Sequence, residues 1–233
     1  MLLSLKNKYV CLNSPKTGTY YRESVLHTCY EYSFHNECKH SRKRLINQWE
    51  PRDNQDIQIK TNSGDGAIRH LNIPQVMEWV TSKNIQIDDD LFWFTFTRNP
   101  WDRAVSFYNM HLNWNCKVSG IEHTITSEHF MKFLSQSEFK DYDAQITYIQ
   151  YNDFKVDFIG KLENMCNDMS YVLDRLNLKN ICHLNKNREH QPQWFKLRRY
   201  HHLIRKIWTD EIIEYIAEYD RDVIELQKYS FTS

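Results

Sequence analysis

The sequence predicts an α/β fold, a P-loop-like three-layer sandwich with a central, mainly parallel sheet flanked by helices. The first observation is an apolar, β-rich run that passes through a polar loop into a helical pattern at residues 9–23. The second is the same order of features at residues 92–108. The third is length, since 233 residues suffice for one such domain and are too few for two, so we expect residues 1–233 to form a single domain.

The balance of charge excludes two classes of partner. Lys and Arg number 30, as do Asp and Glu, so no overall field attracts nucleic acid or an anionic membrane. No stretch is long and apolar enough to span a bilayer, and we expect no stable membrane insertion. A first core strand beginning at about Lys8 leaves no room for an apolar signal segment. These observations predict a cytoplasmic protein.

Cysteine and histidine spacing predicts neither a disulfide framework nor a metal site. The six cysteines include no CxxC pair and show no regular spacing. Cys29, His35, Cys38 and His40 are ligand types, but a structural zinc site usually has four ligands in two well-spaced pairs. We therefore expect no bound metal.

The first strand–loop–helix unit predicts an anion site. Val10 and Leu12 suit a buried strand, and Pro15 ends it. Gly18 allows backbone N–H groups to turn inward, where the following helix presents its positive end.

The side chains of this loop add to that prediction. Lys16 supplies a mobile positive charge, and Thr17 and Thr19 supply hydroxyl donors. An ordinary strand-to-helix turn with a solvated lysine explains this segment equally well by itself.

The second unit predicts a second anion site. Arg98 follows the apolar run of residues 92–97, and Pro100 suits a first helical turn. Ser106 falls about two turns into that helix, on a flank that can face Arg98.

Apolar spacing predicts the remaining elements. The expected helices span residues 19–30, 74–80, 101–112, 127–134, 144–151, 163–176 and 212–226, and one further strand spans residues 156–160. Residues 113–126 have loop composition. Thr209 is expected to cap the last helix through its hydroxyl. The basic residues at 39–44 are either a solvated face or a patch for an acidic sugar, and residues 198–206 form a second basic cluster.

Several of these segments resemble the sulfotransferases. Residues 15–19 resemble their 5′-phosphosulfate loop, and residues 98–108 resemble their 3′-phosphate motif. The similarity is closer to the carbohydrate sulfotransferases, which residues 156–164 and 219–231 also resemble. It is weak between residues 30 and 67 and otherwise spans nearly the whole chain.

The resemblance implies an enzyme that transfers a sulfuryl group from 3′-phosphoadenosine 5′-phosphosulfate (PAPS) to a hydroxyl of a carbohydrate acceptor. It implies a metal-free reaction in which Lys16 stabilises the leaving group. The residues implied to bind the donor are Lys16, Thr17, Gly18, Thr19, Tyr20, Arg98, Ser106, Lys186 and Arg188. For the last two, which lie in a charged loop at residues 182–188, a solvated position is an equal alternative.

His70 is the candidate general base. It lies between the two anion motifs, ahead of the strand that leads to Arg98, where the resemblance implies a catalytic histidine. Imidazole titrates near neutral pH, which suits proton transfer. The alternative is a histidine that merely caps a turn.

Two other functions stay open. Tyr20 stands where the resembling proteins commonly have a small hydroxyl residue, so the chain could be an inactive relative that binds nucleotide or glycan. A P-loop kinase is the other alternative, but its Gly-x4-Gly-Lys-Ser/Thr pattern is missing, since the single glycine follows Lys16.

Overall fold

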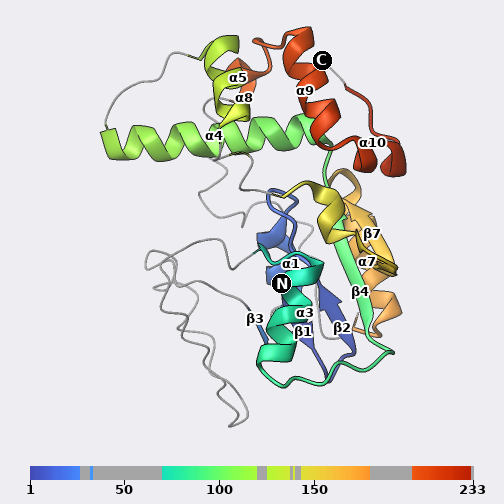
Figure 1. Cartoon of the computed structure of the whole chain (residues 1–233). Helices are drawn as coiled ribbons and strands as arrows, with labels where there is room; N and C mark the ends of the chain where they lie inside the picture. Colours follow the sequence, from blue (N-terminus) through green and yellow to red (C-terminus); the bar gives the residue numbers. More distant parts are fainter. Residues whose placement is uncertain are drawn as a thin grey trace.

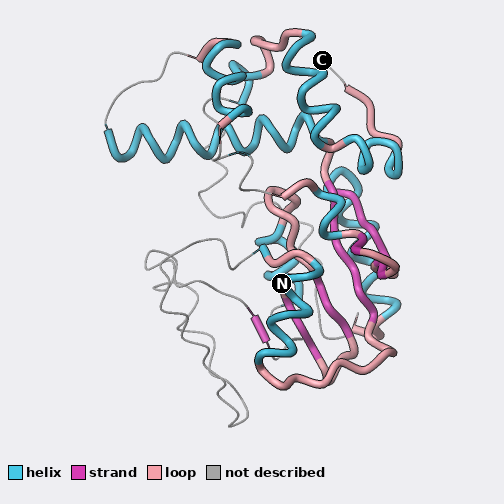
Figure 2. The backbone as a smooth tube through the Cα atoms, in the orientation of Figure 1, coloured by secondary structure: helices cyan, strands magenta, loops and turns pink. Residues whose placement is uncertain are grey.

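A computed structural model describes residues 1–26, 32–33, 70–119, 125–136, 139, 143–178 and 201–231. Within this part of the chain a five-stranded sheet has the order β3-β1-β2-β4-β7. The strands are β1 (Leu2–Ser4), β2 (Tyr9–Cys11), β3 (Tyr32–Ser33), β4 (Phe92–Thr97) and β7 (Phe158–Lys161). In Figures 1 and 2, β4 lies between β2 and β7 in the sheet.

The sheet is mixed and mainly parallel, which confirms the predicted fold class. β2 and β7 each run parallel to β4, while β1 is antiparallel to both β2 and β3. β3 therefore points the same way as β2, and among the described strands of this sheet only β1 runs the other way. Cys11 pairs with Phe94, and Phe96 pairs with Gly160. The carboxyl ends of β2, β4 and β7 therefore lie at the same end of the sheet.

Helices cover both faces of the sheet. Alternate residues of β2 enter different core clusters, Tyr9 and Cys11 on one face and Val10 on the other. The first face packs against α1 (Thr19–Leu26) and α7 (Met165–Arg175), and the second against α3 (Ile73–Ser82). The expected three layers are therefore confirmed.

A group of helices forms a third core cluster beside the sheet. It comprises α4 (Pro100–Ser119), α5 (Ser127–Ser135), α8 (His201–Ile204), α9 (Asp210–Tyr219) and α10 (Arg221–Gln227). Figure 1 shows α4 lying across the end of the sheet, with α5, α8 and α9 on its far side. Two short 3₁₀ helices, η3 (Gln145–Tyr148) and η4 (Leu162–Asn164), connect these layers. Thr209 caps α9 by accepting a hydrogen bond from Ile212 N, as predicted.

Four expectations about the elements were wrong. The core begins at β1, before Lys8, because residues 2–4 form a hairpin with β2. Residues 113–119 continue α4, since no proline or glycine interrupts the chain before Gly120. Residues 144–151 contain η3 and β5 (Gln150–Tyr151), which pairs with β6 (Phe154–Lys155) through a turn at the left-handed Asn152. Residues 212–226 form two helices that meet at Asp220.

The predicted helices at residues 74–80, 101–112 and 127–134 are confirmed as parts of α3, α4 and α5, and residues 165–175 of the helix predicted at 163–176 are confirmed as α7. The first predicted helix is confirmed as α1 to Leu26, and residues 27–30 lie outside the described residues. The cluster Cys29, His35, Cys38 and His40 also lies outside them, as does the first basic cluster. No described helix is both long and apolar enough to cross a membrane.

Candidate functional site

The loop between β2 and α1 is a tight turn with two left-handed residues. Lys16 has φ +66° and Gly18 has φ +82°, while the Thr17 hydroxyl donates to Ser14 O over 2.7 Å. A Cβ at Gly18 would lie 2.8 Å from both Leu162 Cδ1 and Met165 Cε. Glycine is required there both for its φ and because the loop packs directly on η4 and α7.

Arg22 is the buried support of this loop, and sequence reasoning missed it. Its guanidinium donates to Thr17 O, to Asn13 Oδ1 over 3.2 Å and to Thr19 Oγ1 over 3.4 Å. The group also lies 4.9 Å from the centre of the Phe96 ring. A cation in the first turn of a helix is unfavourable with the helix dipole, and this was the signal that could have identified it. Thr17 and Thr19 both face this support.

Lys16 occupies a partly desolvated position above the loop. Its Nζ donates to Met110 Sδ over 3.5 Å. Burial, together with the nearby positive charge of Arg98, lowers the pKa of Lys16 to about 8. The ammonium is therefore less stable here than in water, and an anion bound beside it would restore its stability.

Arg98 meets the same loop from the end of β4. Its Nη1 donates to Lys16 O over 3.4 Å. Its backbone is fixed by Gln145, which accepts from Arg98 N over 2.8 Å and donates to Arg98 O over 3.0 Å. The two predicted anion motifs, 82 residues apart, are thus in contact.

Ser106 lies on the side of α4 that faces the loop. Arg103 Nε donates to Pro15 O over 3.3 Å, and Met110 contacts Lys16. Residues 103, 106 and 110 are spaced three and four apart, so they share one face of the helix. The half-buried Ser106 therefore stands between two contacts with the loop.

His70 forms a hydrogen bond with Asn13, near the start of the loop. Its Nδ1 lies 2.7 Å from Asn13 O. A carbonyl oxygen can only accept, so Nδ1 carries the proton and Nε2 is the basic nitrogen of the neutral ring. The hydroxyl of Tyr148 donates to His70 O over 2.7 Å and holds the backbone of the same residue.

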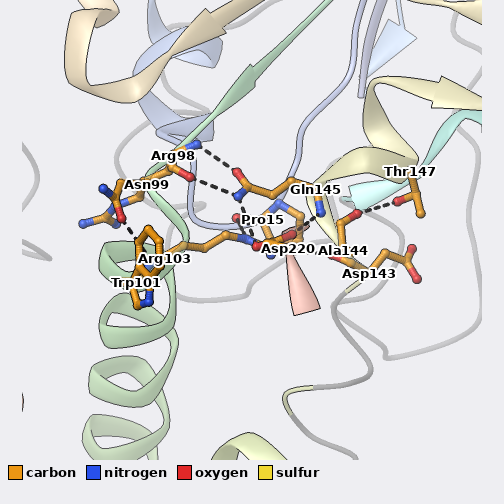
Figure 3. Close-up of polar contacts among 10 residues, drawn as sticks. All are labelled: Pro15, Arg98, Asn99, Trp101, Arg103, Asp143, Ala144, Gln145, Thr147 and Asp220. Carbon is orange, nitrogen blue, oxygen red and sulfur yellow. Dashed lines mark hydrogen bonds and ion pairs between the residues drawn. The ribbon is translucent and has the colours of Figure 1, made fainter. Parts of the chain in front are cut away.

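A buried polar network joins the loop, α4 and the carboxyl-terminal helices (Figure 3). Arg103 Nη1 and Asp220 Oδ2 form an ion pair at 3.0 Å, and the two side chains are 1% and 3% exposed. Asp220 also accepts from the backbone N of Gln145 over 2.9 Å and from its Nε2 over 3.2 Å. Because Gln145 holds Arg98, the network fixes both anion motifs at once. Sequence reasoning did not identify Arg103 or Gln145 as part of it.

The last residues of the described chain close over the Arg98 turn. Asn99 N donates to Glu163 Oε1 over 2.7 Å, and Asn99 Nδ2 donates to Ser230 O over 2.9 Å. The Tyr229 hydroxyl lies 2.9 Å from Thr97 Oγ1 and donates to Glu163 Oε2 over 3.3 Å. The segments at residues 156–164 and 219–231 therefore support the site through its backbone.

Three predicted residues cannot be placed. Lys186 and Arg188 lie outside the described residues, and for Tyr20 only the helical backbone is described.

A separate cavity of about 240 Å³ lies between α4 and α5, lined by Tyr108, His111, Leu112, His129, Lys132, Phe133 and Gln136. Helical spacing puts Tyr108 and Leu112 on the side of α4 opposite Met110, away from the loop.

One comparison with known proteins identifies a family. The model of the sulfotransferase family matches residues 7–226, which is all but the first six and last seven residues. No curated protein and no solved structure matches the chain.

Replacing Asp220 with Ala should strongly destabilise the protein. It leaves the buried Arg103 guanidinium without its counter-charge, and breaking a buried pair in this way costs about 3–5 kcal/mol. The free energy of unfolding, measured by urea denaturation, tests this. Glu225→Ala, on the exposed side of α10, is the control and should change that free energy by less than about 0.5 kcal/mol. Equal effects of the two substitutions would show that the ion pair does not hold the fold.

Proposed function

Because the chain belongs to the sulfotransferase family, we propose that it transfers a sulfuryl group from PAPS to a hydroxyl of a carbohydrate acceptor. The observation that carries the proposal is the contact between the two anion motifs, Arg98 Nη1 to Lys16 O. PAPS carries a phosphosulfate on one side of its ribose and a phosphate on the other, and two adjacent cationic sites suit such a ligand.

The described residues divide between the two anionic groups of the donor. Lys16 and the N–H groups of the loop at Thr17, Gly18 and Thr19 are proposed to bind the 5′-phosphosulfate. Arg98 and Ser106 are proposed to bind the 3′-phosphate. Hydrogen bonds from Arg22 hold the loop in place, which supports its proposed role. Hydrogen-bond donors that are fixed before the ligand arrives lose little freedom on binding. Tyr20, Lys186 and Arg188 remain proposed contacts.

The proposed reaction requires one base and one cation. The donor supplies an electrophilic sulfur whose leaving group is a phosphate oxygen. His70 Nε2 takes the proton of the acceptor hydroxyl as the acceptor oxygen forms its bond to sulfur. Lys16 and the loop N–H groups stabilise the negative charge that grows on the departing oxygen. The Asn13 carbonyl supports this role for His70 because it fixes the tautomer in which Nε2 is basic.

The carbohydrate acceptor rests on the resemblance of the motifs to those of carbohydrate sulfotransferases. The inactive relative is the competing proposal, and turnover separates it from an enzyme. Sulfate transfer from labelled PAPS to a panel of glycans would identify the acceptor. Binding of PAPS with no transfer to any of them would favour the binding protein.

Adenosine 3′,5′-bisphosphate should raise the melting temperature of the protein more than adenosine 5′-phosphate does. The second ligand lacks the 3′-phosphate and so loses its charge-assisted hydrogen bonds to Arg98 and Ser106. Thermal denaturation at equal ligand concentrations measures the difference. Ser106→Ala should reduce the advantage of the bisphosphate, and Ser135→Ala, an exposed serine on α5, should leave it unchanged. Equal shifts from both nucleotides would contradict the assignment of the 3′-phosphate site.

His70→Ala should lower turnover roughly a hundredfold to ten-thousandfold, the usual contribution of a positioned base. Its affinity for the bisphosphate should stay within a few-fold of wild type, because the proposed base contacts the acceptor. The wild-type rate should also fall as the pH drops through the pKa of the histidine, and the variant should lack that fall. His129→Ala, on the exposed side of α5, is the control. Wild-type turnover in His70→Ala would place the base elsewhere.

The specificity constant kcat/KM should fall as the pH rises through about 8. This is the pKa of Lys16 in the free protein, and only its protonated form attracts the donor. In Lys16→Arg the fall near pH 8 should disappear even where the rate is lower, because arginine stays charged. A wild-type profile that stays level to pH 9.5 would show that Lys16 does not act as a cation in this step.

A further inference from the structure

Met110 is the side chain that the structure places against the Lys16 ammonium. The Sδ atom accepts from Lys16 Nζ over 3.5 Å, and the residue is 37% exposed. A thioether is a weak acceptor. Lys16 can therefore exchange this contact for a phosphate oxygen, which accepts far more strongly.

The Met110 sulfur can also be oxidised. A sulfur lone pair attacks one oxygen of hydrogen peroxide, an S–O bond forms and the O–O bond breaks. Sulfur loses two electrons, and the other oxygen leaves as water with both protons. The product, methionine sulfoxide, is polar and is returned to methionine by sulfoxide reductases. Its oxygen would lie on the atom that already faces Lys16.

We propose that Met110 is a site of reversible oxidation by hydrogen peroxide, and that its sulfoxide holds the Lys16 ammonium away from the phosphosulfate of the donor. The effect on turnover rests on the proposed function of Lys16. The capture of Lys16 by the sulfoxide does not, since it follows from the contact between Nζ and Sδ alone.

A matched control exists in the chain. Met77, on α3, is also 37% exposed, so the two residues are matched in their overall exposure to solvent. Met165 and Met169 are 9% and 0% exposed and lie in the core on the α7 side of the sheet. A comparison of Met110→Leu with Met77→Leu therefore separates the position of the sulfur from its exposure.

The first experiment measures turnover before and after peroxide in wild type, Met110→Leu and Met77→Leu, with the sulfoxides located by peptide mass spectrometry. For each variant the rate after peroxide is divided by the rate before it, so differences in starting rate between the variants do not affect the comparison. Wild type and Met77→Leu should lose roughly tenfold, the scale of one hydrogen bond to a charged group. Methionine sulfoxide reductase should restore them, and Met110→Leu should keep its rate. An equal loss in Met110→Leu would overturn the proposal.

The second experiment needs no turnover. An amine-reactive ester labels neutral lysine, and the lowered pKa of Lys16 gives it a large neutral fraction at pH 8. Oxidation of Met110 should slow the labelling of Lys16 several-fold and leave that of the exposed Lys155 unchanged. Unchanged labelling of Lys16 would overturn the proposal whatever the turnover. Slowed labelling in a protein with no transferase activity would uphold it and reject the proposed function instead.

Discussion

The buried ion pair between Arg103 and Asp220 is the interaction on which the arrangement of the site depends. Removing two charges from water is costly, and such a pair persists only where further hydrogen bonds satisfy both groups. Here Arg103 also donates to the carbonyl oxygens of Pro15 and Asp143, and Asp220 accepts from Gln145. These bonds reach the loop at Pro15 and the segment at residues 143–145. The requirement to satisfy two buried charges thus brings together the loop, the Arg98 turn and the carboxyl-terminal helices.

This support holds three cationic side chains around one loop. The charge of Arg98 opposes the protonation of Lys16, and Arg22 adds a third cation beneath the same loop. Like charges at such distances repel and would move apart on a flexible scaffold. The bonds from Gln145 fix the backbone of Arg98, and those from Arg22 fix the backbone of the loop at Thr17 and the side chain of Asn13. The protein therefore keeps three cationic side chains around one loop in an unfavourable electrostatic arrangement.

The sequence predicted the parts of the site whose signals are local. The loop was identified by a strand, a turn and the beginning of a helix that follow one another within a few residues. The same pattern identified Arg98 and Ser106. The fold class was predicted from these two strand–turn–helix units. Arg103 and Asp220 are 117 positions apart, and no spacing rule connects residues so distant. The helix expected through residues 212–226 is broken at Asp220, whose carboxylate binds Arg103 and Gln145. These partners are also distant in the sequence, so local spacing could not predict the break. The local sequence pattern also did not predict β1, whose three residues acquire a strand conformation only by pairing with β2 and β3.

The contacts that Asp220, Tyr229 and Ser230 make with the site have a consequence for the order in which the protein matures. The loop between β2 and α1 is synthesised well before these three residues. Until they emerge, Arg103 lacks its counter-charge and Asn99 lacks its bond to Ser230. A nascent chain can therefore pair β2 with β4 before Asp220 has been made, but the Arg98 turn gains its last contact only once Ser230 is present. A fragment that ends before Asp220 would contain the loop and yet leave the Arg103 guanidinium without its counter-charge.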